Sequence, residues 1–216
     1  RNGTKIRMDE IEEATTKVIA GPQKKSRVIS EEERKLTAYH EAGHAVVMKS
    51  LPKSDPVHQI TIIPRGMAGG FTMSLPEKDQ FFETKGNMLN SIKHLLGGRV
   101  AEQLKLDDIS TGASNDLERA TKMARAMITR YGMSSDFDMV ALETVSNQYL
   151  GGDASLACSA ETQKKIDEKV VALVRQQHEK AAGILLENRE KLDELARYLY
   201  QKETITGEEF MKILNE

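Results

Sequence analysis

The chain has 216 residues, of which 39% are hydrophobic and 30% charged, and its formal net charge is −2. This length and balance predict one medium-sized soluble domain, or a domain with a fragment of another, and the lack of a dense Lys/Arg block argues against nucleic-acid binding. The single cysteine, Cys158, excludes an internal disulfide and a multi-cysteine zinc site, and no apolar run approaches the ~18–20 residues that span a bilayer.

The first segment, residues 4–20, has irregular helical spacing of apolar residues and is stopped by Gly21-Pro22. A polar linker follows. A short helix that ends in a linker cannot form a core of its own. We therefore expect residues 1–25 to be the tail of an upstream domain and residues 26–216 to be the main domain.

Residues 31–50 predict a long helix, with Ser30 as its N-cap and Leu51-Pro52 at its end. Its apolar residues fall on one continuous arc, and His40 and His44 lie at the edge of that arc. Gly43 costs about 1 kcal/mol against alanine inside a helix. Such a residue suggests close approach by another helix or by a substrate.

This helix carries the pattern H-E-x-x-H, formed by His40, Glu41 and His44. Histidines four residues apart lie one turn apart on the same face, where both can bind one Zn²⁺. Glu41 lies beside them and can take a proton from a metal-bound water that attacks a peptide carbonyl. The alternative is that two histidines merely border a core helix.

A β-branched, apolar run follows at residues 57–63, and a run with partial alternation follows at residues 69–75. The two predict a hairpin or a small sheet. An open edge of this sheet could receive an extended polypeptide as an added strand. An ordinary small sheet that packs the helix explains the same residues. We expect His58, in the first strand, to be structural.

Residues 79–105 are predicted to be mainly helical, with one apolar arc from Met88 to Leu104. Arg99 falls inside the arc, which predicts a carboxylate partner, and Glu102 lies at its edge. Gly97-Gly98 is expected to interrupt the helix and could permit close packing. His94 is expected on the polar side, away from any metal.

A turn-rich loop at residues 109–115 precedes a helix predicted for residues 116–131, with Asn115 as its N-cap. Asp116 begins the buried face of this helix. An acidic residue in a first turn is also explained by the helix dipole, so the pattern leaves both a functional and a structural interpretation open.

The remaining chain is expected to be a loop over residues 133–159 and then helices over 160–179, 181–200 and from 206 or 207 to 214. The apolar stripes of this part could pack internally or against another subunit. The sequence thus predicts a mainly α fold, a helical zinc-peptidase domain with a small β-sheet beside the H-E-x-x-H helix.

A catalytic zinc site takes three protein ligands, and the motif supplies two. Val47 and Ser50 exclude the longer motif with a third histidine. The remaining candidates are Asp116 and Glu102, and spacing alone leaves the choice open.

Four runs carry a resemblance to a known family, in the order residues 39–45, 61–66, 96–102 and 111–121. Together they closely resemble the peptidase domain of FtsH-type AAA proteases, which are ATP-dependent, membrane-anchored zinc metalloproteases. Residues 18–22, at the end of the predicted first helix, also look like the end of that family's ATPase lid.

The resemblance implies that His40, His44 and Asp116 bind zinc, that Glu41 is the general base, and that Glu102 supports a ligand or packs the helix. Residues 30–135 would form the catalytic part and residues 160–216 a helical C-terminal part. The strand that could receive substrate comprises Gly70, Phe71, Thr72, Met73, Ser74 and Leu75.

The resemblance further implies a homo-hexamer that degrades unfolded or misfolded proteins at the cytoplasmic face of the bacterial inner membrane, or at an organelle inner membrane. ATP and the membrane anchor would belong to segments outside this chain, which is expected to have no ATPase activity of its own. A hypothesis of a different class is an assembly module whose metal site is structural or silent.

Overall fold

The computed structural model describes residues 6–22, 29–66, 68–76, 81–106, 108–145 and 154–215. Its described elements confirm a mainly helical fold with a small antiparallel sheet. In chain order they are α1 (Met8–Ala20), α2 (Glu31–Ser50), β1 (Val57–Thr61), β2 (Phe71–Ser74), α3 (Lys85–Leu106), the short 3₁₀ helix η1 (Thr111–Ala113), α4 (Ser114–Thr129), β3 (Glu143–Val145), β4 (Ala154–Leu156), α5 (Ala160–Glu187), α6 (Arg189–Lys202), β5 (Thr204–Thr206) and α7 (Gly207–Asn215).

The three-stranded sheet has the order β2-β1-β5, with both neighbours antiparallel to β1. The predicted hairpin is therefore confirmed, and Thr61 pairs with Phe71 at its turn end. Strand β5 was not anticipated, because three residues between two helices give no alternating pattern. Glu203, in the left-handed conformation with φ of 65°, turns the chain from α6 into this strand.

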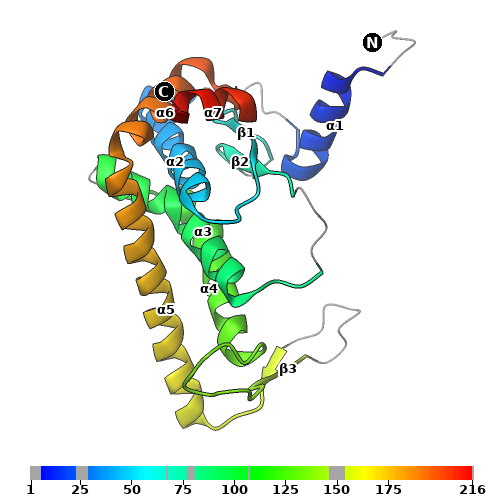
Figure 1. Cartoon of the computed structure of the whole chain (residues 1–216), viewed down its shortest axis with the longest axis vertical. Helices are drawn as coiled ribbons and strands as arrows, with labels where there is room; N and C mark the ends of the chain where they lie inside the picture. Colours follow the sequence, from blue (N-terminus) through cyan, green and yellow to red (C-terminus); the bar gives the residue numbers. More distant parts are fainter. Residues whose placement is uncertain are drawn as a thin grey trace.

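Helix α2 lies at the centre of the described fold, between α3, α6 and the sheet (Figure 1). It crosses α3 at Gly43 and Gly97, where a Cβ on Gly43 would lie 2.5 Å from the carbonyl oxygen of Gly97. The predicted close approach at Gly43 is thus made by another helix. This contact sets the spacing of the two helices whose side chains surround the histidines.

Two apolar cores flank this crossing. One joins α2 to the sheet, α6 and α7, and the other joins the first half of α3 to α4 and to the start of α5. Helices α3 and α5 contribute to both cores. The site helix α2 is therefore anchored by β1, β5, α6, α7 and the C-terminal parts of α3 and α5.

Several predicted boundaries were wrong. Helix α3 begins at Lys85 rather than near residue 79, because the Thr84 hydroxyl caps the amide of Asn87. Helix α5 continues past residue 180 to Glu187, since good helix formers stand at the predicted break, and Asn188 joins it to α6. The stretch predicted as a loop holds the β3–β4 hairpin, whose connection lies outside the described residues.

Helix α1 contacts the turn between β1 and β2. Arg65, only 4% exposed, makes two hydrogen bonds to the carboxylate of Glu13, at 2.9 and 3.2 Å. The predicted boundary near residue 25 lies outside the described residues. Within the described part of the chain, the helices include none that is long and apolar enough to cross a membrane.

Candidate metal centre

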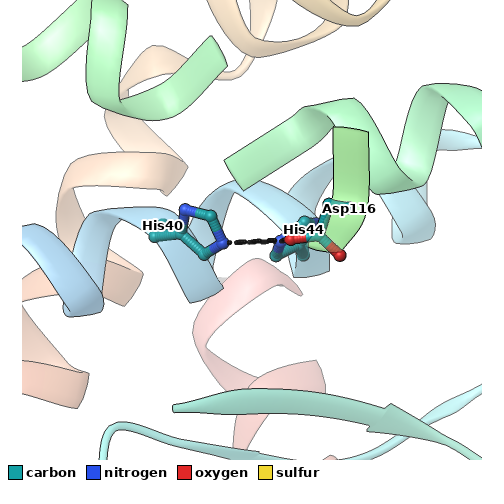
Figure 2. A group of neighbouring side chains, drawn as sticks. All are labelled: His40, His44 and Asp116. Carbon is teal, nitrogen blue, oxygen red and sulfur yellow. Dashed lines mark hydrogen bonds and ion pairs between the residues drawn. The ribbon is translucent and has the colours of Figure 1, made fainter. Parts of the chain in front are cut away.

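The two histidines of α2 face a carboxylate from α4. The Nε2 atoms of His40 and His44 lie 3.0 Å apart, and Oδ2 of Asp116 lies 3.5 Å from each of them. Figure 2 shows the three side chains converging from the two helices. Among the described residues, these three form the cluster of histidine, cysteine or acidic side chains that could hold a metal ion.

The geometry fits zinc. Bonds of 2.0–2.1 Å in a tetrahedral site place neighbouring ligand atoms about 3.3–3.4 Å apart. The three distances of 3.0, 3.5 and 3.5 Å are close to one face of such a tetrahedron. Two imidazole nitrogens and one carboxylate oxygen are also a donor set that zinc accepts, and a fourth position is left for water.

The far nitrogen of each ring is held by a second partner. Nδ1 of His40 lies 2.7 Å from Oε1 of Glu102, and Nδ1 of His44 lies 2.8 Å from the carbonyl oxygen of His94. Both partners accept, so each Nδ1 carries hydrogen and each Nε2 can present its lone pair to a metal. Glu102, one of the two candidates for a third ligand, thus contacts the side of His40 that faces away from Asp116.

Glu102 is completely buried and is itself fixed by several donors. The backbone amide and the hydroxyl of Ser110 donate to it at 2.9 and 3.1 Å, and Arg99 donates at 3.2 Å. The carboxylate partner expected for Arg99 is therefore Glu102. Because Ser110 also caps η1, the same residue links Glu102 to the segment that leads into α4.

The start of α4 differs from the prediction in a way that matters for Asp116. The helix begins at Ser114, directly after η1, and Asn115 is not its cap. Asp116 lies in the first turn of α4 and is partly buried. Asp116 therefore follows η1, a short helix that was not expected within the predicted loop and that Ser110 caps.

Gly98 lies against both histidine rings. A Cβ built on it would be 2.5 Å from Nε2 of His44 and 2.6 Å from Nε2 of His40. The predicted interruption of the helix at Gly97-Gly98 was wrong, because α3 continues through both glycines to Leu106, whereas the prediction of close packing there is confirmed. The two glycines have different neighbours. Gly97 meets the backbone of α2, and Gly98 makes room for the metal-site candidate.

Glu41 is 5% exposed and lies between the histidines and the sheet. The hydroxyl of Thr72, in β2, is 2.8 Å from Oε2 of Glu41 and 3.1 Å from its backbone oxygen. Burial raises the pKa of Glu41, although His44, His40 and the Thr72 hydroxyl act in the opposite direction. A carboxylate with a raised pKa is a stronger base.

The charges of the site favour a cation. Burial disfavours the charged form of His40, but its hydrogen bonds with Asp116 and Glu102 outweigh burial and raise its pKa to about 10 in the metal-free protein. For Asp116, burial is outweighed by hydrogen bonds from the two histidines, which lower its pKa. A site that stabilises a protonated His40 beside an ionised Asp116 favours positive charge, and it is therefore suited to a divalent metal ion.

The sequence predicted His94 on a polar face, away from any metal, and this position was wrong. Its ring centroid lies 5.2 Å from that of His44, and its Nδ1 lies 3.3 Å from the carbonyl oxygen of His44. Burial lowers its pKa to about 3, so the ring is neutral near pH 7. His94 also lines a polar hollow that includes Met48, Leu51 and Ser74, beside the end of β2.

The residues expected to receive substrate form the outer strand of the sheet and its two flanking positions. Phe71 to Ser74 are β2 itself, and Gly70 and Leu75 stand on either side. Among the described strands, β2 pairs only with β1, so its other edge is available. His58 lies in β1, outside the metal-site candidate.

Sequence reasoning did not anticipate the contact between Thr72 and Glu41. One signal was present, because Gly70 and Thr72 are two residues apart and so lie on the same face of a strand. A small residue and a hydroxyl on that face permit close approach to a helix. The backbone carbonyl of His94 carried no signal, because any residue at that position offers one.

Comparison with known proteins identifies relatives over nearly the whole chain. The profile of Peptidase family M41 matches residues 27–213. An ATP-dependent zinc metalloprotease FtsH 1 from Thermoanaerobacter sp. is 51% identical over all of this chain and 36% of its own length. The ATP-dependent zinc metalloproteases FtsH of Caldicellulosiruptor bescii and Clostridium perfringens are 49% and 50% identical, over 98% and 95% of this chain and 35% and 29% of their own lengths. The chain thus spans about a third of the length of these relatives.

Proposed function

Since this chain belongs to peptidase family M41, we propose that it is the zinc-dependent endopeptidase domain of a membrane-anchored, ATP-dependent protease that degrades unfolded or misfolded proteins. One observation carries the proposal most directly. A buried glutamate, Glu41, stands between a cluster of side chains that could hold a metal ion and the outer strand of a sheet.

In the proposed site, His40, His44 and Asp116 hold zinc. Zinc, when bound, lowers the pKa of a coordinated water and polarises the scissile carbonyl. Glu41 takes the proton from the attacking water and returns it to the leaving amine. Glu102 and the carbonyl oxygen of His94 keep the imidazoles in the tautomer that leaves Nε2 free.

The substrate would be an extended polypeptide that adds to the free edge of β2. Main-chain hydrogen bonds of this kind depend little on side chains, so the proposed strand of Gly70 to Leu75 suits many sequences. It also suits only segments that are unfolded, because a folded segment has already paired its backbone groups. This supports unfolded proteins as the substrate class.

Three further parts of the proposal concern the whole protein, and the names of the relatives support the first of them, the use of ATP. ATP would be used by segments outside this chain. The assembly would be a homo-hexamer. Its membrane would be the bacterial inner membrane, with this domain on the cytoplasmic side, or an organelle inner membrane.

The competing function is an assembly module with a structural or silent metal site. A structural zinc site is closed by a fourth protein ligand and needs no buried base. The carboxylate of Glu41, held against β2, favours catalysis over this alternative.

The proposal is tested with the purified, zinc-loaded chain and an unfolded polypeptide whose cleavage is followed by mass spectrometry. The parent should cleave, and Glu41→Gln should keep its zinc and lose activity by roughly 10²–10⁴-fold. Glu208→Gln, the same change at an exposed position of α7, serves as the matched control. A zinc-loaded parent that cleaves nothing would favour the assembly module, and an active Glu41→Gln chain would rule out the proposed base.

A further inference from the structure

We propose that Thr72 is the positioning residue for Glu41, so that one strand both receives the substrate and orients the catalytic base. This inference rests on the proposed function. It concerns a residue whose side chain, unlike those of the H-E-x-x-H motif, has no obvious catalytic chemistry. The inference is supported by the hydrogen bond from Thr72 to Glu41, which joins the outer strand of the sheet to the centre of helix α2.

The Thr72 hydroxyl has one hydrogen and two acceptors within reach. Oε2 of Glu41 lies at 2.8 Å and the backbone oxygen of Glu41 at 3.1 Å. Hydrogen bonds to an ionised acceptor are shorter and about twice as strong as bonds to a neutral one. The hydroxyl therefore donates mainly to Oε2, which leaves Oε1 as the oxygen that accepts a proton from water.

Gly70 completes the support. A Cβ on this residue would lie 3.1 Å from Cγ of Glu41 and 2.9 Å from a methyl group of Thr37. The backbone of the strand therefore packs directly on the aliphatic part of Glu41, while Thr72, two residues later on the same face, holds the carboxylate. A glutamate side chain that is fixed at both ends needs little reorganisation to reach the water.

Strand β2 thus has two roles in the same residues. The Thr72 side chain and the Cβ position of Gly70 face α2, and among the described strands none pairs with the outer edge of β2, which leaves that edge for a substrate strand. The alignment of a substrate on this edge fixes its carbonyl relative to Thr72, and Thr72 fixes Glu41. Thr72 should consequently affect the rate of the chemical step more than the affinity for substrate.

The test compares Thr72→Val, which removes the hydroxyl but keeps the shape, with Thr72→Ser, which keeps the hydroxyl. We expect kcat of Thr72→Val to fall roughly ten- to a hundredfold with KM within about threefold of the parent, because one hydrogen bond to a charged group is lost. Zinc content should stay at the parent's value, and Thr72→Ser should recover most of kcat.

Thr61→Val is the matched control for damage to the sheet. Thr61 is buried in β1, and its hydroxyl contacts Glu203 and Thr204 rather than Glu41. Thr61→Val should have a lower melting temperature than the parent and the same kcat. The proposal is overturned if Thr72→Val keeps kcat within twofold, if Thr72→Ser is impaired equally, or if Thr61→Val loses as much kcat.

A second readout separates this proposal from the proposed function. In a crystal structure of Thr72→Val, the carboxylate of Glu41 should leave the orientation it has in the parent, and an unmoved carboxylate contradicts the positioning role whatever the activity. A parent that holds zinc but does not cleave, or a Glu41→Gln chain that does, overturns the proposed function instead. The position of the carboxylate then still decides whether Thr72 holds Glu41.

Discussion

At the scale of single residues, the two histidines of the metal-site candidate are fixed by unlike partners. His40 donates to the buried carboxylate of Glu102, and His44 donates to a backbone carbonyl. The H-E-x-x-H pattern predicted the positions of both rings, because helical spacing is regular. It could not separate Asp116 from Glu102, since that choice depends on how α3 and α4 lie across α2, and no spacing in the sequence encodes that arrangement.

Gly98→Ala tests the space between the rings. Its Cβ would lie within 2.6 Å of Nε2 of both His40 and His44, so at least one ring has to move. We expect at least a tenfold loss of zinc affinity, measured by competition with a chelator. Gly183→Ala in α5 is the matched control, because nothing lies within 4 Å of its Cβ. Parent-like zinc affinity in Gly98→Ala would mean that the rings are less confined than described.

Zinc affinity should depend on pH through His40. The metal-free pKa of about 10 means that this ring carries a proton near pH 7, and the proton on Nε2 has to leave when zinc binds. Affinity should therefore rise with pH, by about tenfold per unit from pH 7 to 9 for one released proton. Asp116 and Glu102, whose pKa values are lowered, stay ionised throughout and add nothing to this slope.

Chelator competition at pH 7, 8 and 9 measures this slope. Glu102→Gln removes a group that raises the pKa of His40, so its slope should be shallower than the parent's. An affinity of the parent that is constant from pH 7 to 9 contradicts the assigned protonation.

At the scale of elements, the site depends on the crossing of α2 and α3. Helices and the hairpin were predicted from periodicity, because each has an apolar face that repeats over several turns or residues. The ends of elements were less predictable, since they depend on single contacts such as the Thr84 cap of α3 or the Ser110 cap of η1. The three-residue strand β5 exists because β1 offers it a partner, which is a tertiary effect.

Gly43→Ala should loosen the crossing. Its Cβ would lie 2.5 Å from the carbonyl oxygen of Gly97 and 2.6 Å from Cβ of Ala101, so the helices have to separate. We expect a loss of about 1–3 kcal/mol in the free energy of unfolding, although alanine is the better helix former by about 1 kcal/mol. Urea unfolding of the zinc-free chain measures the change. A variant as stable as the parent would show that the crossing is not tightly packed.

At the scale of the whole molecule, two apolar cores hold the site between them. The composition predicted a chain able to bury a core, and the apolar arcs identified many of its members. The division into two cores joined by α3 and α5 could not be predicted, because it follows from the lengths and crossing of helices rather than from any one stripe. The C-terminal helices showed no catalytic residues in the sequence, yet α6 and α7 pack in the same core as α2.

Phe210→Ala tests this support from a distance. Phe210, in α7, is 1% exposed and belongs to the core that contains α2. Its truncation should cost about 3–5 kcal/mol of unfolding free energy. Phe82→Ala makes the same change at a residue that is 89% exposed and should alter stability by less than about 0.5 kcal/mol. Equal effects in the two variants would contradict the described core.

The central claim is that His40, His44 and Asp116 together hold one zinc ion, and the most direct test is the zinc content per chain of the parent, Asp116→Ala and Glu102→Ala, purified side by side. We expect one zinc in the parent, a large loss in Asp116→Ala, and weakened but measurable binding in Glu102→Ala, because a supporting residue typically contributes about 10–100-fold in affinity. One tightly bound zinc in Asp116→Ala, with none in Glu102→Ala, would contradict it and make Glu102 the third ligand.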